Sequence, residues 1–407
     1  MATLIYNVTD LQNMNLDLAG DYELANDIDA SDTATWNWDG TFSQYFGFEP
    51  IGDSTNRFTG SFNGRGFAIT DLYINRFTYV GLFRYTEGAT IQNVSLVDAA
   101  ITGTDQVGAL VGQVYGEPTP CTIANCHISG NVSGSMRVGG LIGYSFSADI
   151  SNCSSSAVVI GSSTNVGGLI GHFNGEGTGT VTESYTTGAV TGFYAVGGLV
   201  GLYAAAATSQ CYVTGNIEAD TLVGGFIGQA NSGTISDCYA MGAVTALGIT
   251  WPGTASGFVD YNRATVTNSY STGLVTGTTA AGFCSDDGTI TNCFWDIQTS
   301  GQATSDGGTG KTTAEMKQLG TFSAWSIART TAANPTGGYP FLGWQIGLTN
   351  TWLIYGAGGA ISPRIFIPIE DKVALELVRN VEMSAGGRAF IDKEGKFHYD
   401  SRFGRVV

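Results

Sequence analysis

Short apolar stretches, separated by Gly, Ser, Asn and Thr, fill the middle of the chain. These runs are rich in β-branched residues and too short for helices, so the pattern predicts strands. One phrase, Val-Gly-Gly-Leu-Ile-Gly or a close variant, recurs with its copies beginning at residues 79, 107, 138, 166, 196, 223, 255 and 280. Successive copies lie 25 to 32 residues apart, and this near-constant step predicts a repeat protein.

One repeat unit cannot bury its own apolar face, but stacked units make that face continuous. The sequence therefore predicts an all-β fold, a parallel β-solenoid (β-helix) whose coils are spaced by roughly 4.8 Å. The glycines should lie where the backbone turns a corner or approaches a neighbour, and the leucines should face the interior. Variation in the step should fall in outer loops. The repeat residues singled out are Gly139, Gly140, Leu141, Gly167, Gly168, Leu169, Gly197, Gly198, Leu199, Gly224 and Gly225.

A second phrase, typified by Ile-Ser-Asn-Cys, follows most copies by about a dozen residues. Its cysteines share one register, in which Ser184 and Ser269 also occur, and a buried column of small side chains is expected. A disulfide between neighbouring coils or metal binding are the alternatives, although no C-x₂-C pair favours zinc. The column consists of Cys126, Cys153, Cys211, Cys238 and Cys293. The residues one place earlier, Asn125, Asn152, Asn268 and Asn292, are expected to form an amide ladder.

Composition narrows the classes of function. Glycine supplies 59 of the 407 residues, charged residues only 13%, and the formal charge of −17 disfavours nucleic-acid binding. No apolar run is long enough to span a membrane. Residues 1–10 lack the pattern of a secretory signal, so we expect either a removed leader or release by lysis, as in a virus particle.

The repeated phrase resembles the GLUG motif, which occurs in repeats of bacterial surface adhesins and in the non-catalytic part of some IgA-cleaving peptidases. Segments 10–31 and 310–325 look like those that begin and close such arrays. The resemblance covers about residues 10–345. The resemblance implies a right-handed parallel solenoid on the outside of a cell or particle. It indicates little about function, because the motif is defined by its coil and not by a binding or catalytic site.

Changes in pattern suggest four domains. They are an N-terminal cap with the first coils (1–78), the repeats (79–310), a closing cap and linker (311–361), and a small α+β anchoring module (362–407). In the last of these, residues 369–383 have helical periodicity and 389–399 predict a hairpin. Residues 384–402 resemble a short segment of phage tail and baseplate proteins.

Candidate chemistry is sparse. Polysaccharide-cleaving enzymes on similar solenoids need converging carboxylates, but here the acidic residues are scattered among registers. Arg137 and Arg263 are the only basic residues between 85 and 310. We therefore expect no enzymatic activity and no cofactor, with a polysaccharide depolymerase as the minority alternative.

Two N-terminal clusters remain as candidate ligand sites. Asp21, Asp27, Asp29 and Asp32 could hold Ca²⁺, although solvated turn carboxylates are favoured because the spacing does not match a calcium loop. Trp36, Trp38 and Tyr45 could stack on sugars as ligand-facing aromatics, or could cap the end of the solenoid.

The expected function is that of a rigid extracellular rod on a virion or a bacterial cell surface. It would attach to a host glycan or protein, and the C-terminal module would bind other subunits of the virion or surface. The alternative is a purely structural or decorating subunit. A homo-oligomer, for example a trimer, is a further expectation; nucleic acid and a membrane span are not expected.

Overall fold

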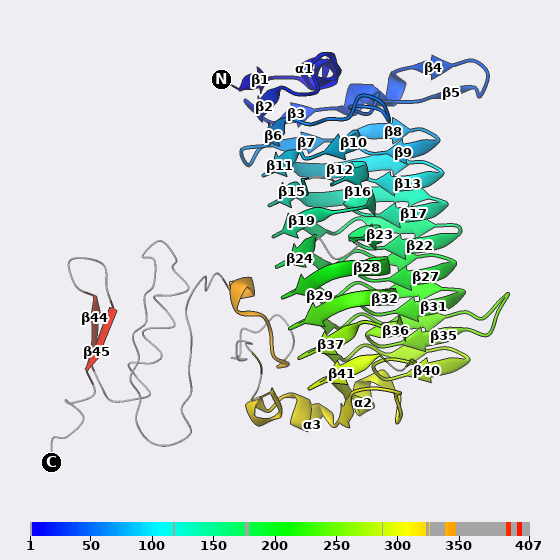
Figure 1. Ribbon diagram of the computed structural model, residues 1–407, viewed down its shortest axis with the longest axis vertical. Helices are drawn as coiled ribbons and strands as arrows, with labels where there is room; N and C mark the ends of the chain where they lie inside the picture. Colours follow the sequence, from blue (N-terminus) through cyan, green and yellow to red (C-terminus); the bar gives the residue numbers. More distant parts are fainter. Residues whose placement is uncertain are drawn as a thin grey trace. The chain divides into compact units, whose positions relative to one another are not determined.

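The computed structural model describes residues 2–116, 119–175, 179–286, 288–322, 325, 338–346, 388–391 and 397–400. The chain forms two compact units, residues 1–325 and 326–407. The first unit is a stack of coils, wound so that equivalent strands of successive coils lie beside each other (Figure 1). Strands within each of its three long sheets pair in parallel, which confirms the predicted β-solenoid.

Most coils contribute strands to all three sheets. The first sheet contains β9 (Thr78–Val80), β13 (Asp105–Gly108), β17 (Met136–Gly139), β22 (Thr164–Gly167), β27 (Tyr194–Gly197), β31 (Thr221–Gly224), β35 (Thr254–Ser256) and β40 (Thr279–Ala281). The second contains β1 (Thr3–Ile5), β2 (Asp21–Leu24), β6 (Ser61–Asn63), β10 (Phe83–Glu87), β11 (Thr90–Gln92), β14 (Val111–Tyr115), β15 (Cys121–Ala124), β18 (Ile142–Ser145), β19 (Ala148–Ser151), β23 (Ile170–Asn174), β24 (Thr180–Thr182), β28 (Val200–Ser209), β32 (Ile227–Ser236), β36 (Val259–Asn262), β37 (Thr265–Thr267) and β41 (Thr289–Thr291).

The third sheet has the largest number of strands. It contains β3 (Ile28–Asp29), β7 (Ala68–Thr70), β8 (Tyr73–Asn75), β12 (Ser95–Thr102), β16 (His127–Gly134), β20 (Ser154–Ser155), β21 (Val158–Gly161), β25 (Tyr185–Thr186), β26 (Val190–Thr191), β29 (Tyr212–Val213), β30 (Ile217–Ala219), β33 (Tyr239–Ala240), β34 (Val244–Ala246), β38 (Tyr270–Ser271), β39 (Val275–Thr276), β42 (Phe294–Asp296) and β43 (Thr309–Lys311). A separate hairpin, β4 (Trp38–Asp39) with β5 (Gln44–Tyr45), projects from the N-terminal end (Figure 1).

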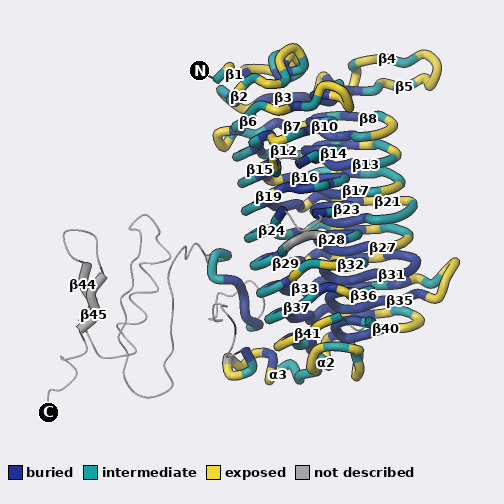
Figure 2. Tube along the Cα trace, in the orientation of Figure 1, coloured by how far each residue is buried: buried dark blue, intermediate teal, exposed yellow. Residues whose placement is uncertain are grey.

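Much of the chain that winds through the coils is buried (Figure 2), and its apolar side chains form aligned columns in the interior. One column takes the leucine or phenylalanine of each copy of the repeated phrase, and every member is fully buried. Its members are Leu82, Leu110, Leu141, Leu169, Leu199, Phe226, Phe258 and Phe283. The three phenylalanines stack nearly face to face, with neighbouring ring centroids 4.7 and 4.8 Å apart. This column makes the hydrophobic core continuous from coil to coil.

The strand register corrects the first copy of the repeat and explains the variable step. Val80, not Tyr79, pairs with Val107, so the first copy begins one residue later than the sequence comparison suggested. Extra residues fall outside the coil, as expected. The longest step ends in an exposed loop, residues 247–253, that precedes β35 and projects beyond its neighbours (Figure 2).

Asparagines form a ladder along one turn of the solenoid. Asn93, Asn125 and Asn152 all have left-handed backbones, with φ between 50° and 56°. The side-chain amide of Asn125 donates to Asn93 at 3.1 Å, and that of Asn152 donates to Asn125 at 2.6 Å. Asn268 and Asn292 repeat the contact at 3.5 Å near the other end. Asparagine suits this turn because it tolerates a left-handed backbone better than most residues.

The last coils replace two glycines of the repeat by polar side chains. Ser256 occupies the register of Gly224, and Asp260 that of Gly228. The buried Asp260 carboxylate accepts hydrogen bonds from the hydroxyls of Thr254, Ser256 and Ser285, at 2.7 to 2.9 Å. Burial nevertheless raises the pKa of Asp260 to about 6, against an ordinary value of 3.8.

This raised pKa predicts a pH-dependent cost to stability. Because folding favours the protonated form, Asp260 stabilises the fold most below pH 4, and this contribution is lost as the pH rises to about 6. Asp260→Asn should therefore be more stable than the wild type at pH 7 by up to about 3 kcal/mol, and similar to it at pH 4. Urea unfolding of both proteins across this range tests the prediction. A difference that stays constant with pH would contradict it.

Short helices lie at the ends of the first unit. They are α1 (Val8–Gln12), η1 (Asn13–Leu16), η2 (Ser31–Thr35), α2 (Ile297–Ser300), α3 (Thr313–Met316) and η3 (Leu319–Phe322). Helix α3 begins with a capping box in which Thr312 accepts from the backbone of Glu315. The capping residue of α3 is therefore Thr312.

The second unit is described only in part. It holds η4 (Gly343–Ile346) and the antiparallel hairpin of β44 (Arg388–Ile391) and β45 (Phe397–Asp400), which agrees with the hairpin predicted over 389–399. The helix predicted over 369–383 lies outside the described residues. In the described part of the chain, no helix is long and apolar enough to cross a membrane.

Candidate functional site at the N-terminal end

The candidate site lies at the N-terminal end of a column of glycines to which successive coils contribute one residue each. In five successive coils this register is Gly112, Gly143, Gly171, Gly201 and Gly228, which lie between paired residues of neighbouring strands. Arg84 of β10 occupies the same register in the preceding coil.

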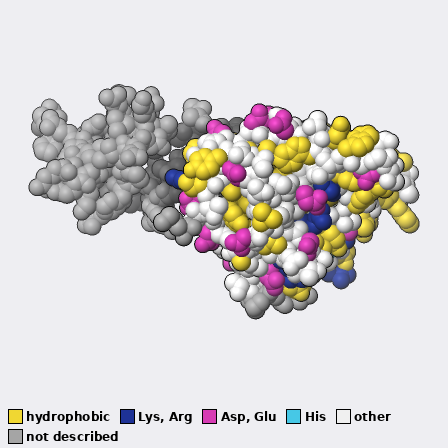
Figure 3. Space-filling view, turned by 90° about the horizontal axis from the view of Figure 1, so that it is seen from above, with side chains coloured by type: hydrophobic (Ala, Val, Ile, Leu, Met, Phe, Trp, Pro, Cys, Tyr) yellow, Lys and Arg dark blue, Asp and Glu magenta, His cyan; other side chains and the backbone are white. Residues whose placement is uncertain are grey.

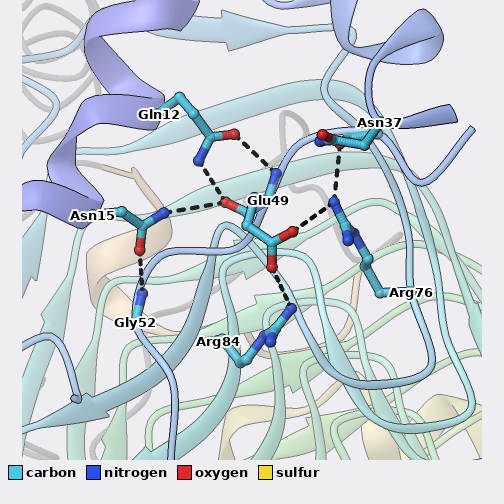
Figure 4. Close-up of polar contacts among 8 residues, drawn as sticks. Gln12, Asn15, Asn37, Glu49, Gly52, Arg76 and Arg84 are labelled. Atoms are coloured by element: carbon cyan, nitrogen blue, oxygen red, sulfur yellow. Dashed lines mark hydrogen bonds and ion pairs between the residues drawn. The ribbon is translucent and has the colours of Figure 1, made fainter.

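Arg84 and Arg76 hold one carboxylate, that of Glu49, between them. Each guanidinium lies 2.8 Å from a different oxygen of Glu49 (Figure 4). Burial lowers the pKa of Arg76, while the charge of Glu49 opposes that shift. The Nε atoms of both arginines are buried and have no hydrogen-bond partner among the described residues. The ion pairs therefore fix Glu49 in place while leaving part of each guanidinium unsatisfied.

Two amides from the N-terminal helices hold the backbone around Glu49. Gln12 accepts from the Glu49 backbone N–H at 2.9 Å and donates to its carbonyl at 2.8 Å (Figure 4). Asn15 accepts from the Gly52 N–H at 2.8 Å. Gln12 and Asn15 are three residues apart, a spacing that places both side chains on one side of a helical turn.

A third amide joins this group from the segment before the β4–β5 hairpin. Asn37, which has a left-handed backbone (φ 57°), donates to the carbonyl of Gly47 at 2.7 Å. Arg76 donates to the same carbonyl at 3.3 Å. Gly47 is required there, because a Cβ would lie 2.3 Å from the Tyr73 carbonyl oxygen. The polar cradle consists of Gln12, Asn15, Asn37, Glu49, Arg76 and Arg84.

A surface hollow of about 520 Å³ opens beside the polar cradle. It is lined by Gln12, Asn15, Trp36, Asn37 and Glu49. The Trp36 ring is half-buried and stacks on Phe48, with ring centroids 6.5 Å apart. A second hollow of about 750 Å³ shares Asn15 and Glu49 with the first and reaches Arg57, Arg84 and Glu87. An aromatic face among fixed amides and a carboxylate can bind a ligand rich in hydroxyl groups.

The structure separates the three aromatic residues singled out in the sequence. Trp36 lines the hollow, whereas Trp38 and Tyr45 face each other on the β4–β5 hairpin, with ring centroids 4.9 Å apart, and line neither hollow. The cradle residues were missed because amides and arginines far apart in sequence converge only at the end of the fold. One signal was available: Arg76 and Arg84 are among the few basic residues outside the C-terminal segment.

Three of the four acidic N-terminal residues accept hydrogen bonds from other groups of the chain. Asp27 accepts from the Ala68 N–H at 2.8 Å, Asp29 from the Ser31 N–H at 2.9 Å, and Asp21 from the Ser61 hydroxyl at 2.6 Å. The Ser31 contacts also lower the pKa of Asp29. Asp32 lies in η2. Within the described residues, no group of three or more His, Cys, Asp or Glu side chains is placed to hold a metal ion.

The cysteine register lies in the interior of the coils. Cys126, Cys153, Cys211, Cys238 and Cys293 are at most 2% exposed, and all seven cysteines of the chain, each within the described residues, are free thiols. The Cys153 N–H donates to the Ser184 hydroxyl at 3.1 Å, so serine continues the column. Burial raises the pKa of the Cys126 and Cys238 thiols, which disfavours the reactive thiolate.

Two parts of the chain match a known motif. Residues 134–160 and 219–245 match the family model described as the GLUG motif, which confirms the resemblance of the repeated phrase. The chain is therefore a β-solenoid protein, two segments of which match the GLUG motif.

Individual relatives give the comparison more detail. The chain is 39% identical to halomucin of Haloquadratum walsbyi over 176 residues, which cover 41% of this chain and 2% of halomucin. It is 28% identical to an immunoglobulin A1 protease of Streptococcus sanguinis over 170 residues, 40% of this chain and 8% of the protease. The chain thus spans only a small part of the length of these relatives.

A solved structure shares the fold. The crystal structure of a candidate immunoglobulin A1 protease from Bacteroides ovatus matches with a TM-score of 0.53 at 20% sequence identity, covering 84% of this chain and 92% of that chain. The resemblance of residues 384–402 to phage tail and baseplate proteins is not supported by the comparisons.

The comparisons overturn the prediction that the chain is not an enzyme. Relatives from Streptococcus sanguinis and Streptococcus pneumoniae, 28% and 26% identical, are named immunoglobulin A1 proteases. The sequence argument rested on the scattered carboxylates and on the scarcity of basic residues between 85 and 310. Matched segments that make up 8% of a protease show that these coils occur in proteins with much additional chain.

Proposed function

We propose that this chain is an extracellular attachment protein, on a bacterial cell or a virion, that binds a host carbohydrate at its N-terminal end. The single observation that carries the proposal is the hollow lined by Trp36, three side-chain amides and Glu49. The amides are already held by backbone contacts, so little side-chain entropy is lost when a sugar hydroxyl binds. The solenoid would hold this end away from the surface, and the C-terminal module, residues 362–407, would bind the other subunits.

Trp36→Ala tests this function. We expect the variant to bind host-cell oligosaccharides about tenfold more weakly or worse, a loss of about 1.4 kcal/mol, because the aromatic face of the hollow is removed. A glycan array identifies the ligand, and isothermal titration calorimetry measures the change in affinity.

Trp38→Ala is the matched control, because Trp38 is exposed and lies outside both hollows. It should bind as tightly as the wild type. Since Trp36 also packs on Phe48, thermal unfolding must show that Trp36→Ala remains folded at the assay temperature. Equal affinity of a folded Trp36→Ala variant and the wild type would refute the proposed site.

The named relatives favour a second candidate function, participation in the proteolysis of immunoglobulin A1. Incubation of the 407-residue chain with immunoglobulin A1, followed by gel electrophoresis, tests it. Defined fragments would support proteolysis by this chain. Intact antibody after long incubation would count against it.

A further inference from the structure

Exposed apolar side chains gather along one edge of the solenoid. Of the fifteen large hydrophobic residues that are exposed in the described part of the chain, nine lie on the β4–β5 hairpin or at the turn that enters the sheet of β9 to β40. These nine form the apolar edge: Trp38, Phe42, Tyr45, Phe77, Met136, Tyr194, Leu247, Ile249 and Trp251. Seen along the solenoid, hydrophobic side chains also gather at the right-hand rim (Figure 3).

The N-terminal end of the apolar edge is an aromatic cluster. Phe77 directly precedes β9 and is 52% exposed, and Phe42 of the hairpin packs edge-on against it at 5.2 Å between ring centroids. Trp38 and Tyr45 face each other on the two strands of the same hairpin, with ring centroids 4.9 Å apart. The strands β4 and β5 pair with each other, so the hairpin presents these rings on an ordered support.

The opposite end of the apolar edge is the loop 247–253, directly before β35. Its tip presents Ile249, 78% exposed, and Trp251, 61% exposed. The loop is held in shape from below. The buried carboxylate of Asp220 accepts the backbone N–H groups of Ile249 and Thr250, and the Thr221 hydroxyl donates to the Pro252 carbonyl at 2.9 Å. A fixed loop with two exposed apolar residues is typical of an interface anchor.

The two ends are related by the order of strands in one sheet. Strand β22 lies midway in the series β9, β13, β17, β22, β27, β31 and β35. With strands spaced about 4.8 Å apart, the aromatic cluster and the loop are about 29 Å apart along the sheet. Met136 begins β17 and Tyr194 begins β27, one strand on either side of β22. The large apolar positions are therefore arranged almost symmetrically about β22.

The apolar edge also avoids the net negative charge of the chain. Among the first residues of these seven strands, Asp105 alone is charged, and its carboxylate is paired with the guanidinium of Arg137 from the next coil. Asp220, just before β31, is buried beneath the loop. Two copies of a chain with a formal charge of −17 would meet least repulsion along such an edge.

We propose that two copies of this chain associate edge to edge and antiparallel, about a two-fold axis at β22. In this arrangement the aromatic cluster of each copy packs against the loop 247–253 of the other, and Met136 packs against Tyr194. A two-fold axis requires the same patch to serve both partners, and a nearly symmetric apolar edge meets that requirement. The association is a dimer rather than the trimer expected from rod-like attachment proteins.

Sedimentation of the full chain tests the association. The wild type should sediment as a dimer, and the double variant Ile249→Ser, Trp251→Ser should raise its dissociation constant about tenfold or more. Leu16→Ser is the matched control, because Leu16 is 84% exposed and lies outside the apolar edge. A monomeric or trimeric wild type, or a double variant that dimerises as well as the wild type, would overturn the proposal.

Cross-linking with a short bismaleimide tests the antiparallel arrangement. Because all native thiols are buried, the wild type should not react. Thr164→Cys, at the axis, should form cross-linked dimers alone. Thr78→Cys and Thr250→Cys should do so only when mixed or combined, since residues at opposite ends meet. Efficient dimers from Thr78→Cys alone would indicate parallel packing and would contradict the proposed arrangement.

A vesicle flotation assay tests the other occupant of the apolar edge. A monomeric chain that floats with phosphatidylcholine vesicles would also overturn the proposal, because a lipid surface would then occupy the edge.

Discussion

Replacing Gly197 by alanine is expected to lower the free energy of unfolding by about 3 kcal/mol or more. A Cβ at this position would lie 2.1 Å from the carbonyl oxygen of Val200 and 2.6 Å from the backbone nitrogen of Gly228. Both atoms belong to the backbone, so no side-chain rotation can make room. Chemical denaturation, monitored by far-UV circular dichroism, gives the change.

Ala281→Gly is the matched control. Ala281 is the equivalent residue in the last coil, as the pairing of Gly197 with Gly224, then Ser256, then Ala281 shows. A side chain is accommodated there, so its removal should change stability by only about 1 kcal/mol. If Gly197→Ala were as stable as the wild type, the proposed close approach of backbones would be incorrect.

Phe258→Ala should destabilise the fold by about 3 to 5 kcal/mol. The ring is fully buried and stacks between Phe226 and Phe283, so its loss leaves a cavity in the continuous column. Because each coil contacts mainly its neighbours, the damage should begin locally. Hydrogen exchange is expected to rise first in β35, β36 and β40, and denaturant unfolding measures the total loss.

Phe258→Leu distinguishes the effect of lost side-chain volume from the effect of lost ring stacking. The same column contains leucine in five coils nearer the N-terminus, so this change should cost clearly less than Phe258→Ala. Equal losses for the leucine and alanine variants would show that ring stacking, rather than filled volume, dominates the column.

The architecture was readable from the sequence because it depends on local repetition. Each Val-Gly-Gly-Leu unit encodes its own corner and its own interior residue, and the step of about 28 residues returns the chain to the same register. The asparagine ladder followed from the same logic. The start of the first copy, Val80 instead of Tyr79, was missed because this copy has one residue fewer between its valine and its leucine than the next copy has.

The candidate site was only partly predictable. Trp36 was singled out, but nothing in the spacing of Gln12, Asn37 and Arg84 indicates that they meet. They come from a helix, an insertion and the first repeat coil, and non-repeating segments carry no periodic signal. The apolar edge was hidden for a related reason, since its residues lie on the β4–β5 hairpin, in the loop 247–253 or at strand starts outside the repeated phrase.

The sequence by itself determined that this chain winds into a parallel solenoid with glycine corners and a column of leucine and phenylalanine. A repeat of constant length imposes that outcome, because each unit can bury its apolar face only against the next. The tertiary structure alone decided where the exposed side chains lie. It brought the polar cradle together at the end of the stack and aligned the aromatic cluster with the loop 247–253, because stacking places residues far apart in sequence on one edge.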